Sequence, residues 1–149
     1  MAIGFGKYGE NGMIHVTLRE IEEAFRKHKQ HRDLSSSLTM TDKMVLFYAV
    51  ECGLKWLYMR KHRLKRTDQA DSTGKSVTDF GHNLNSLLEK NGFSYTIPKI
   101  TAKDSTQIEA DSLHQAWRYG KSIEEEKEKD CLKKLNRIFN ELKNKLNGG

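Results

Sequence analysis

The chain has 149 residues, enough for one domain whose core needs neither disulfides nor a metal to fold. Hydrophobic residues make up only 36% of it, but six Phe, five Tyr and two Trp argue against wholesale disorder. The formal net charge of +6 favours polyanionic partners such as RNA.

Cysteine usage and hydropathy exclude further classes of protein. Cys52 and Cys131 have neither CxxC spacing nor clustered histidines, which argues against a zinc site and a disulfide framework. We therefore expect reduced thiols and no cofactor. The longest apolar run, Met44 to Val50, is too short to cross a bilayer, and no secretory signal opens the chain. We expect a soluble cytoplasmic protein without a membrane partner.

The N-terminal part predicts a lead-in followed by a helix. Residues 1–16 are glycine-rich and are expected to be flexible, whereas residues 17–149 are expected to form the folded domain. Thr17 and Glu20 match a capping box, in which each side chain binds the backbone N–H of the other residue. Apolar residues then recur at helical spacing, which predicts a first helix from Thr17 to Asp33.

The second predicted helix begins near Thr41 or Asp42 and runs to about Arg63. Between Met44 and Met59 it is apolar almost all round, which is typical of a central helix packed on several sides. Glu51 and Lys55 are the exceptions, spaced i,i+4 in the favourable order, and we interpret them as a partly buried structural ion pair.

Three further helices complete the prediction. The third spans Thr78 to Lys90. The fourth opens at the capping-box pattern of residues 106–109 and ends at Gly120, and the fifth opens at a similar pattern over residues 122–125. The sequence thus predicts an all-α, single-domain bundle of about five helices.

Basic side chains concentrate where the second predicted helix ends. Residues 60–66, "RKHRLKR", contain five cations, which we call the basic cluster. These cations are candidate contacts to nucleic-acid phosphates, although they would also suit the negative end of the helix dipole. The cluster consists of Arg60, Lys61, Arg63, Lys65 and Arg66.

Familiar catalytic motifs are missing from the sequence. It has no GxxxxGK[ST] phosphate loop, GxSxG elbow or HExxH helix. "GFGKYG" (Gly4 to Gly9) superficially resembles a dinucleotide fingerprint, but neither a preceding strand nor a closely following helix is predicted.

Three ordered segments instead carry a resemblance to a known superfamily. The first contains Glu51, Leu54 and Lys55, the second His82, Leu84 and Leu87, and the third Arg118 and Tyr119. In order and approximate spacing they resemble the A-E-x-x-L-K, H-x-L-x-x-L and Arg-Tyr patterns of the HEPN superfamily. The resemblance covers residues 41–148 and implies a helical bundle that is often dimeric.

The resemblance also implies a link to RNA. Many HEPN proteins are toxins or antiviral effectors that cut RNA without metal, using an arginine followed after four to six residues by a histidine. Arg118 occupies the position of that arginine, but no histidine follows it anywhere in the sequence. We therefore interpret the chain as a non-catalytic relative in which Arg118 and Tyr119 keep a contact to nucleic acid.

Two other arrangements could supply a histidine. His114 precedes Arg118 by one helical turn, so the two would share a helix face and are candidate catalytic residues in reversed order. Arg26 and His31 have a similar spacing on the first helix, but they lie outside the region of resemblance and are better explained as a solvated face. We interpret His82 as a capping or packing residue, and Trp117 and Tyr119 as core or dimer-interface aromatics in preference to rings that stack on bases.

Three functional hypotheses follow. The first is a HEPN-like protein of a toxin–antitoxin, antiviral-defence or RNA-processing system that binds RNA or a partner protein, as a homodimer or with that partner. The second is a divergent metal-independent endoribonuclease that uses Arg118 and His114. The third is a small helical subunit of a CRISPR-type ribonucleoprotein, favoured by size, helicity and charge alone.

Overall fold

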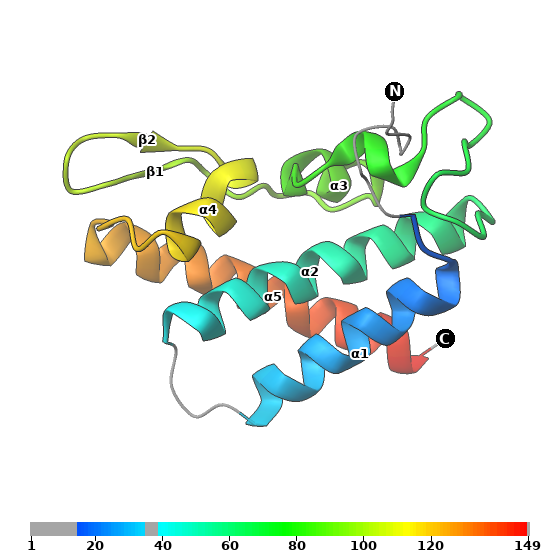
Figure 1. The fold of residues 1–149 in the computed structure, drawn as a ribbon, viewed down its shortest axis with the longest axis horizontal. Coiled ribbons are helices and arrows are strands. Elements are labelled where there is room, and N and C mark those ends of the chain that lie inside the picture. Colours follow the sequence, from blue (N-terminus) through cyan, green and yellow to red (C-terminus); the bar gives the residue numbers. More distant parts are fainter. Residues whose placement is uncertain (1–14, 35–38, 149) are drawn as a thin grey trace.

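The computed structural model describes residues 15–34 and 39–148 of the chain. The predicted lead-in therefore lies outside the described residues except at its last two positions. The described part is mostly helical, as predicted, and contains five α-helices with two short 3₁₀ turns and one small antiparallel sheet (Figure 1). The elements are α1 (Leu18–Leu34), α2 (Met40–Lys61), η1 (Val77–Phe80), α3 (Leu84–Lys90), β1 (Ile100–Thr101), β2 (Gln107–Ile108), η2 (Ala110–Ser112), α4 (Leu113–Arg118) and α5 (Glu125–Gly148).

Helix α2 is the central element, as its apolar sequence predicts. It packs against α1, α3, α4 and α5, and Figure 1 shows it running through the middle of the molecule. Gly53 lies where α1 and α5 approach it most closely: a Cβ atom there would lie 2.8 Å from Leu142 Cδ1 and 2.9 Å from Phe25 Cε1. The missing side chain thus permits the close approach of three helices.

The N-terminal ends of α1 and α2 are both fixed by side-chain caps. The predicted capping box of α1 is confirmed: Thr17 N donates to Glu20 Oε1 at 2.9 Å, and Glu20 N donates to Thr17 Oγ1 at 3.2 Å. Helix α2 begins slightly earlier than predicted because Thr39 forms a second capping box with Asp42. It also ends earlier, at Lys61, and Arg63 adopts a positive φ of 57°.

The third predicted helix is wrong in its first half. The chain forms the 3₁₀ turn η1, breaks at Gly81, whose φ is 55°, and begins α3 only at Leu84. Asn83 caps this helix by accepting a hydrogen bond from Ser86 N at 3.2 Å. His82 therefore lies in the connection before α3 and not within a helix.

The first half of the fourth predicted helix is also wrong. Residues 100–108 form a hairpin in which Ile100 pairs with Ile108, and both side chains are buried. This burial outweighs the local helix-start pattern of residues 106–109. The 3₁₀ turn η2 follows, so α4 covers only Leu113–Arg118, but the predicted end at Gly120 is confirmed by a positive φ of 71°.

Helix α5 begins at Glu125, because the preceding residues extend the hairpin. Ile123 forms a β-bridge with Ala102, and Glu124 N donates to Thr101 O at 3.2 Å. Apolar residues of this helix pack against the core, and Leu132 among them is half-buried. Its buried apolar residues include Leu135, Ile138, Phe139, Leu142 and Leu146.

Candidate functional site

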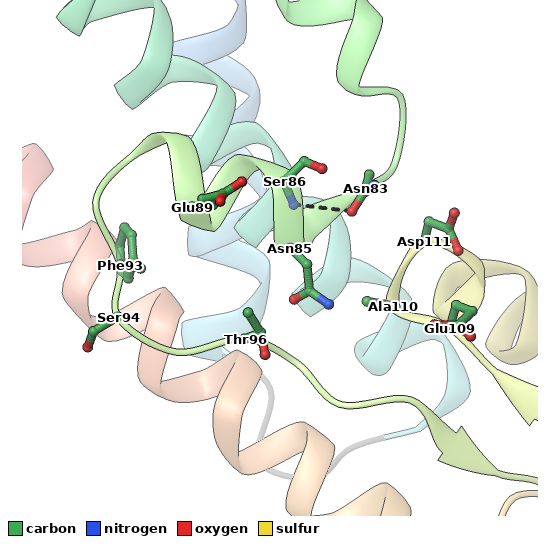
Figure 2. Close-up of a pocket in the computed structure, with 10 residues that line it drawn as sticks. All are labelled: Asn83, Asn85, Ser86, Glu89, Phe93, Ser94, Thr96, Glu109, Ala110 and Asp111. Atoms are coloured by element: carbon green, nitrogen blue, oxygen red, sulfur yellow. Dashed lines mark hydrogen bonds between the residues drawn. The ribbon is translucent and has the colours of Figure 1, made fainter.

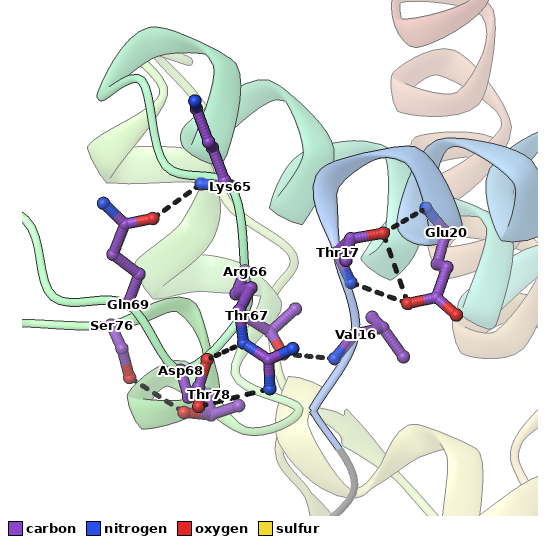
Figure 3. A network of polar contacts seen from close by, with 10 residues as sticks. All are labelled: Val16, Thr17, Glu20, Lys65, Arg66, Thr67, Asp68, Gln69, Ser76 and Thr78. Atoms are coloured by element: carbon purple, nitrogen blue, oxygen red, sulfur yellow. Dashed lines mark hydrogen bonds and ion pairs between the residues drawn. The ribbon is translucent and has the colours of Figure 1, made fainter.

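The basic cluster lies at the C-terminal end of α2 and in the turn after it. All five side chains are exposed. Within the described part of the chain, only Arg66 pairs with a carboxylate, that of Asp68, at 3.0 Å (Figure 3). The Arg60 guanidinium lies over the Trp56 ring, 5.3 Å from its centroid, and Lys61 Nζ donates to the carbonyl of Lys90 at 3.2 Å. Most of this charge is therefore available to an anion.

Arg118 ends α4 and Tyr119 follows it, away from the C-terminal end of α2. Arg118 is exposed, and its Nη2 atom donates to the Tyr48 hydroxyl at 3.0 Å. Tyr119 is 76% exposed, whereas Trp117 is buried and donates from Nε1 to Glu128 at 2.9 Å. Of the two rings predicted as core or dimer-interface aromatics, Trp117 lies in the core, whereas Tyr119 is outside it as an exposed ring beside Arg118.

The predicted contact residues therefore do not form one patch. Tyr48, which holds Arg118, precedes Arg60 by roughly 18 Å along the α2 axis, at about 1.5 Å per residue. An anion bound to the basic cluster would be separate from one bound at Arg118. An extended polyanion could bridge the two positions.

Arg118 and Tyr48 belong to a group of side chains that we call the central polar cluster. Glu51 is its hub: Lys55 Nζ donates to Oε2 at 2.6 Å, and His82 Nδ1 lies 3.1 Å from Oε1. The His82 ring packs against His114, with centroids 4.1 Å apart. The cluster consists of Tyr48, Glu51, Lys55, His82, His114 and Arg118.

Glu51 is the anion of this cluster. Its burial would raise the pKa of the carboxyl, but hydrogen bonds from His82 and Lys55 outweigh burial and hold the pKa below its usual 4.5. The prediction that Glu51 and Lys55 form a partly buried structural pair is confirmed. What the sequence did not predict is the third partner, His82, which α3 and the break at Gly81 bring against α2.

His114 is buried, with 3% of its surface exposed, and its Nδ1 atom has no hydrogen-bond partner. Burial and then the charge of His82 lower its pKa below the usual 6.5. His114 is thus neutral at physiological pH and inaccessible to a large substrate. His82 is 49% exposed, so it is the histidine of this cluster that a ligand can reach.

Tyr48 is the cluster member that the sequence analysis did not single out, and His82 was interpreted only as a capping or packing residue. Tyr48 precedes Glu51 by three residues on α2, so the two share a helix face. That spacing could have indicated that Tyr48 lies beside Glu51. No sequence pattern indicates the contact between His82 and His114, because it depends on how α4 packs against the connection before α3.

A separate groove is acidic and unsuited to phosphates. It has a volume of about 660 Å³ and lies between α3, the segment after it and η2 (Figure 2). Its lining includes Glu89, Glu109 and Asp111, and no Lys or Arg. A polyanion would be repelled here.

The two thiols show no sign of reactivity. Burial raises the pKa of both thiols, Cys52 and Cys131, to about 12, which keeps them protonated. Across residues 15–34 and 39–148, no three His, Cys, Asp or Glu side chains are grouped so as to hold a metal ion. In the same residues no helix has the length and apolarity to cross a membrane.

No protein-family model matches this sequence, and neither a curated protein nor a solved structure matches it.

Proposed function

We propose that this chain is a HEPN-like RNA-binding protein that holds the phosphates of single-stranded RNA with its basic cluster and with Arg118. The observation that supports this most is the exposure of all five cations of the basic cluster, with a carboxylate partner only at Arg66 among the described residues. Such cations displace counterions from the phosphates when they bind, and this release makes the free energy of binding more favourable. We place the protein in a toxin–antitoxin, antiviral-defence or RNA-processing system.

Arg118 and Tyr119 extend the proposed contact. A guanidinium can hold a phosphate with two parallel hydrogen bonds, and an exposed aromatic ring can stack on a base. The hydrogen bond to Tyr48 orients Arg118 without neutralising it. Arg118 therefore keeps its charge for the ligand.

A binding role is preferred over cleavage because of the histidines. None follows Arg118 in the sequence, and His114, the candidate with reversed order, is buried. A general base must reach the proton that it removes. His114 does not meet this requirement in the geometry described here.

A divergent metal-independent endoribonuclease is the second candidate, and the contact between His82 and His114 favours it. In this reading His82 takes the proton of a ribose 2′-hydroxyl while the 2′-oxygen attacks the phosphorus. The bond to the 5′-oxygen breaks, that oxygen takes up a proton, and a 2′,3′-cyclic phosphate remains. Arg118 would stabilise the charge on the phosphoryl oxygens.

Self-association is part of the proposal. Met40 and Tyr119 are the large exposed apolar side chains of the described residues, at 48% and 76%. Gly120 lies against Met40, since a Cβ atom at Gly120 would be 3.7 Å from the Met40 sulfur. This small apolar surface supports a homodimer contact or a protein partner at the α4 end of the bundle.

One experiment separates binding from cleavage. Labelled single-stranded RNA is incubated in EDTA with the wild type and with the Arg118→Ala and His82→Ala variants. We expect retarded, intact RNA with the wild type. Cleavage that disappears in both variants would favour the nuclease, and neither binding nor cleavage would contradict the proposed function.

A further inference from the structure

A small cavity lies beside the basic cluster and borders the central polar cluster at Lys55 and His82. It has a volume of about 250 Å³. This is below the roughly 300–1,000 Å³ typical of pockets for drug-sized ligands, so it suits one flat ring system. It is lined by Val16, Ile21, Lys55, Thr67, Val77, Thr78, Gly81 and His82.

Hydrogen bonds between separate segments hold the walls of this cavity in place (Figure 3). Val16 N donates to Thr67 Oγ1 at 2.9 Å, and Thr78 N donates to Thr67 O at 3.2 Å. The Thr78 hydroxyl lies 2.8 Å from that of Ser76. Because the walls are tied together before a ligand arrives, little ordering is required on binding.

The lining combines apolar walls with a polar edge. Val16, Ile21 and Val77 offer aliphatic surface for the faces of a ring. Lys55 and His82 are held by Glu51, at 2.6 and 3.1 Å, and the remaining ammonium protons and His82 Nε2 can bind the edge of a ring. Apolar faces and a hydrogen-bonding edge are the chemistry of a nucleobase.

The cavity adjoins the proposed phosphate contacts. Its wall residue Thr67 directly follows Arg66, and Arg66 forms a β-bridge with Thr17, next to the wall residue Val16. Lys65 O also accepts a hydrogen bond from Leu18 N at 2.8 Å. The backbone of Lys65 and Arg66 therefore runs beside the cavity wall.

We propose that this cavity is a nucleobase pocket that receives one unpaired base of the bound RNA while Lys65 and Arg66 hold its neighbouring phosphates. The inference rests on the proposed function and names its substrate as single-stranded RNA. In a single strand a base can turn out of the stack and enter a pocket, whereas in a duplex its edge is already hydrogen-bonded to the opposite base. Because the Lys55 ammonium group only donates, the base edge that it binds must carry an acceptor, such as a carbonyl oxygen of uracil.

The test compares labelled oligouridine with a strand of equal length that lacks bases, by fluorescence anisotropy at one salt concentration. We expect oligouridine to bind about tenfold more tightly than the base-free strand, as one or two hydrogen bonds to a base provide. The Val16→Phe variant fills the cavity without changing charge, so it should bind oligouridine as weakly as the base-free strand. Leu132→Phe is the matched control on α5, with half-buried Leu132 outside the pocket lining.

The outcomes are distinguishable. Equal wild-type binding of oligouridine and the base-free strand would overturn the pocket but leave RNA binding intact. No binding of any strand would overturn both, and tighter binding of free UMP than of oligouridine would overturn RNA as the source of the base. The wild-type comparison does not depend on the folding of a variant, and circular dichroism checks Val16→Phe.

Discussion

The rings of His82 and His114 pack against each other with their centroids 4.1 Å apart, although they come from different elements. His114 also packs against Phe47, with ring centroids 5.2 Å apart. His82 is anchored by Glu51, and His114 is not hydrogen-bonded through Nδ1. After burial, the charge of His82 is the largest influence that lowers the pKa of His114.

The buried His114 makes a prediction for stability. His114→Phe should leave the free energy of unfolding unchanged or raise it by about 1 kcal/mol, because it removes a buried nitrogen without a partner. His114→Ala should lower it by about 2–4 kcal/mol by leaving a cavity. Urea unfolding of both variants checks this, and an equal decrease in both would show that the imidazole nitrogens are needed.

The lowered pKa of His114 predicts a pH dependence. The unfolded chain protonates this histidine near its usual pKa of 6.5, but the folded chain does so only at lower pH. Its contribution to stability is therefore full above about pH 6.5 and is lost as the pH falls below it. Glu51, whose pKa lies below 4.5, loses its contribution only at more acidic pH.

NMR titration of the ring protons measures this directly. Besides His82, the charged groups that act on His114 are Glu51, Arg118 and Asp111. Removing the neighbouring imidazole in His82→Ala should raise the pKa of His114. A pKa at or above 6.5 in the wild type would contradict the burial argument.

The pair of Glu51 and Lys55 should be important for stability. Glu51→Gln leaves the Lys55 ammonium group, whose side chain is 14% exposed, without its anion, and should cost about 3 kcal/mol. The matched control is Glu22→Gln, which breaks the exposed i,i+4 pair with Arg26 and should cost only about 0.5 kcal/mol. Similar decreases in chemical unfolding would show that the Glu51 pair contributes no more than a surface pair.

Gly53→Ala tests the closest helix contact. Alanine favours helix by about 1 kcal/mol over glycine, but its methyl group would overlap Leu142 and Phe25. We expect a net decrease of about 1–3 kcal/mol in the free energy of unfolding. The second substitution Leu142→Val should cost less in the Gly53→Ala background than in the wild type, and simple additivity would contradict the overlap.

The sequence predicts the helices well where apolar spacing and capping residues agree. Thr17 with Glu20 marks the start of α1, and the unbroken apolar character of α2 indicates its central place. It fails at residues 106–109, because a local helix-start pattern carries no information on the pairing of Ile108 with Ile100. The burial of that pair is a tertiary effect.

The candidate site is only partly predictable for the same reason. The cations of residues 60–66 and the spacing of Glu51 and Lys55 are local features, and both have the expected exposure or pairing. The contact between His82 and His114, and the cavity between Val16 and Thr78, require segments that are distant in sequence. No periodicity indicates such contacts.

The proposed binding of RNA phosphates by the basic cluster is tested most directly by the salt dependence of the affinity for single-stranded RNA. Neutralising Arg60, Lys61 and Arg63 together to Gln should reduce the slope of log K against log salt by about 2, at about 0.7 for each phosphate that is no longer neutralised. The control neutralises the exposed Lys127, Lys129 and Lys133 of α5, with the same change in net charge, and should leave the slope unchanged. Equal reductions of the slope in both variants would contradict a localised phosphate contact. They would show that the basic cluster acts only through the net charge of the protein.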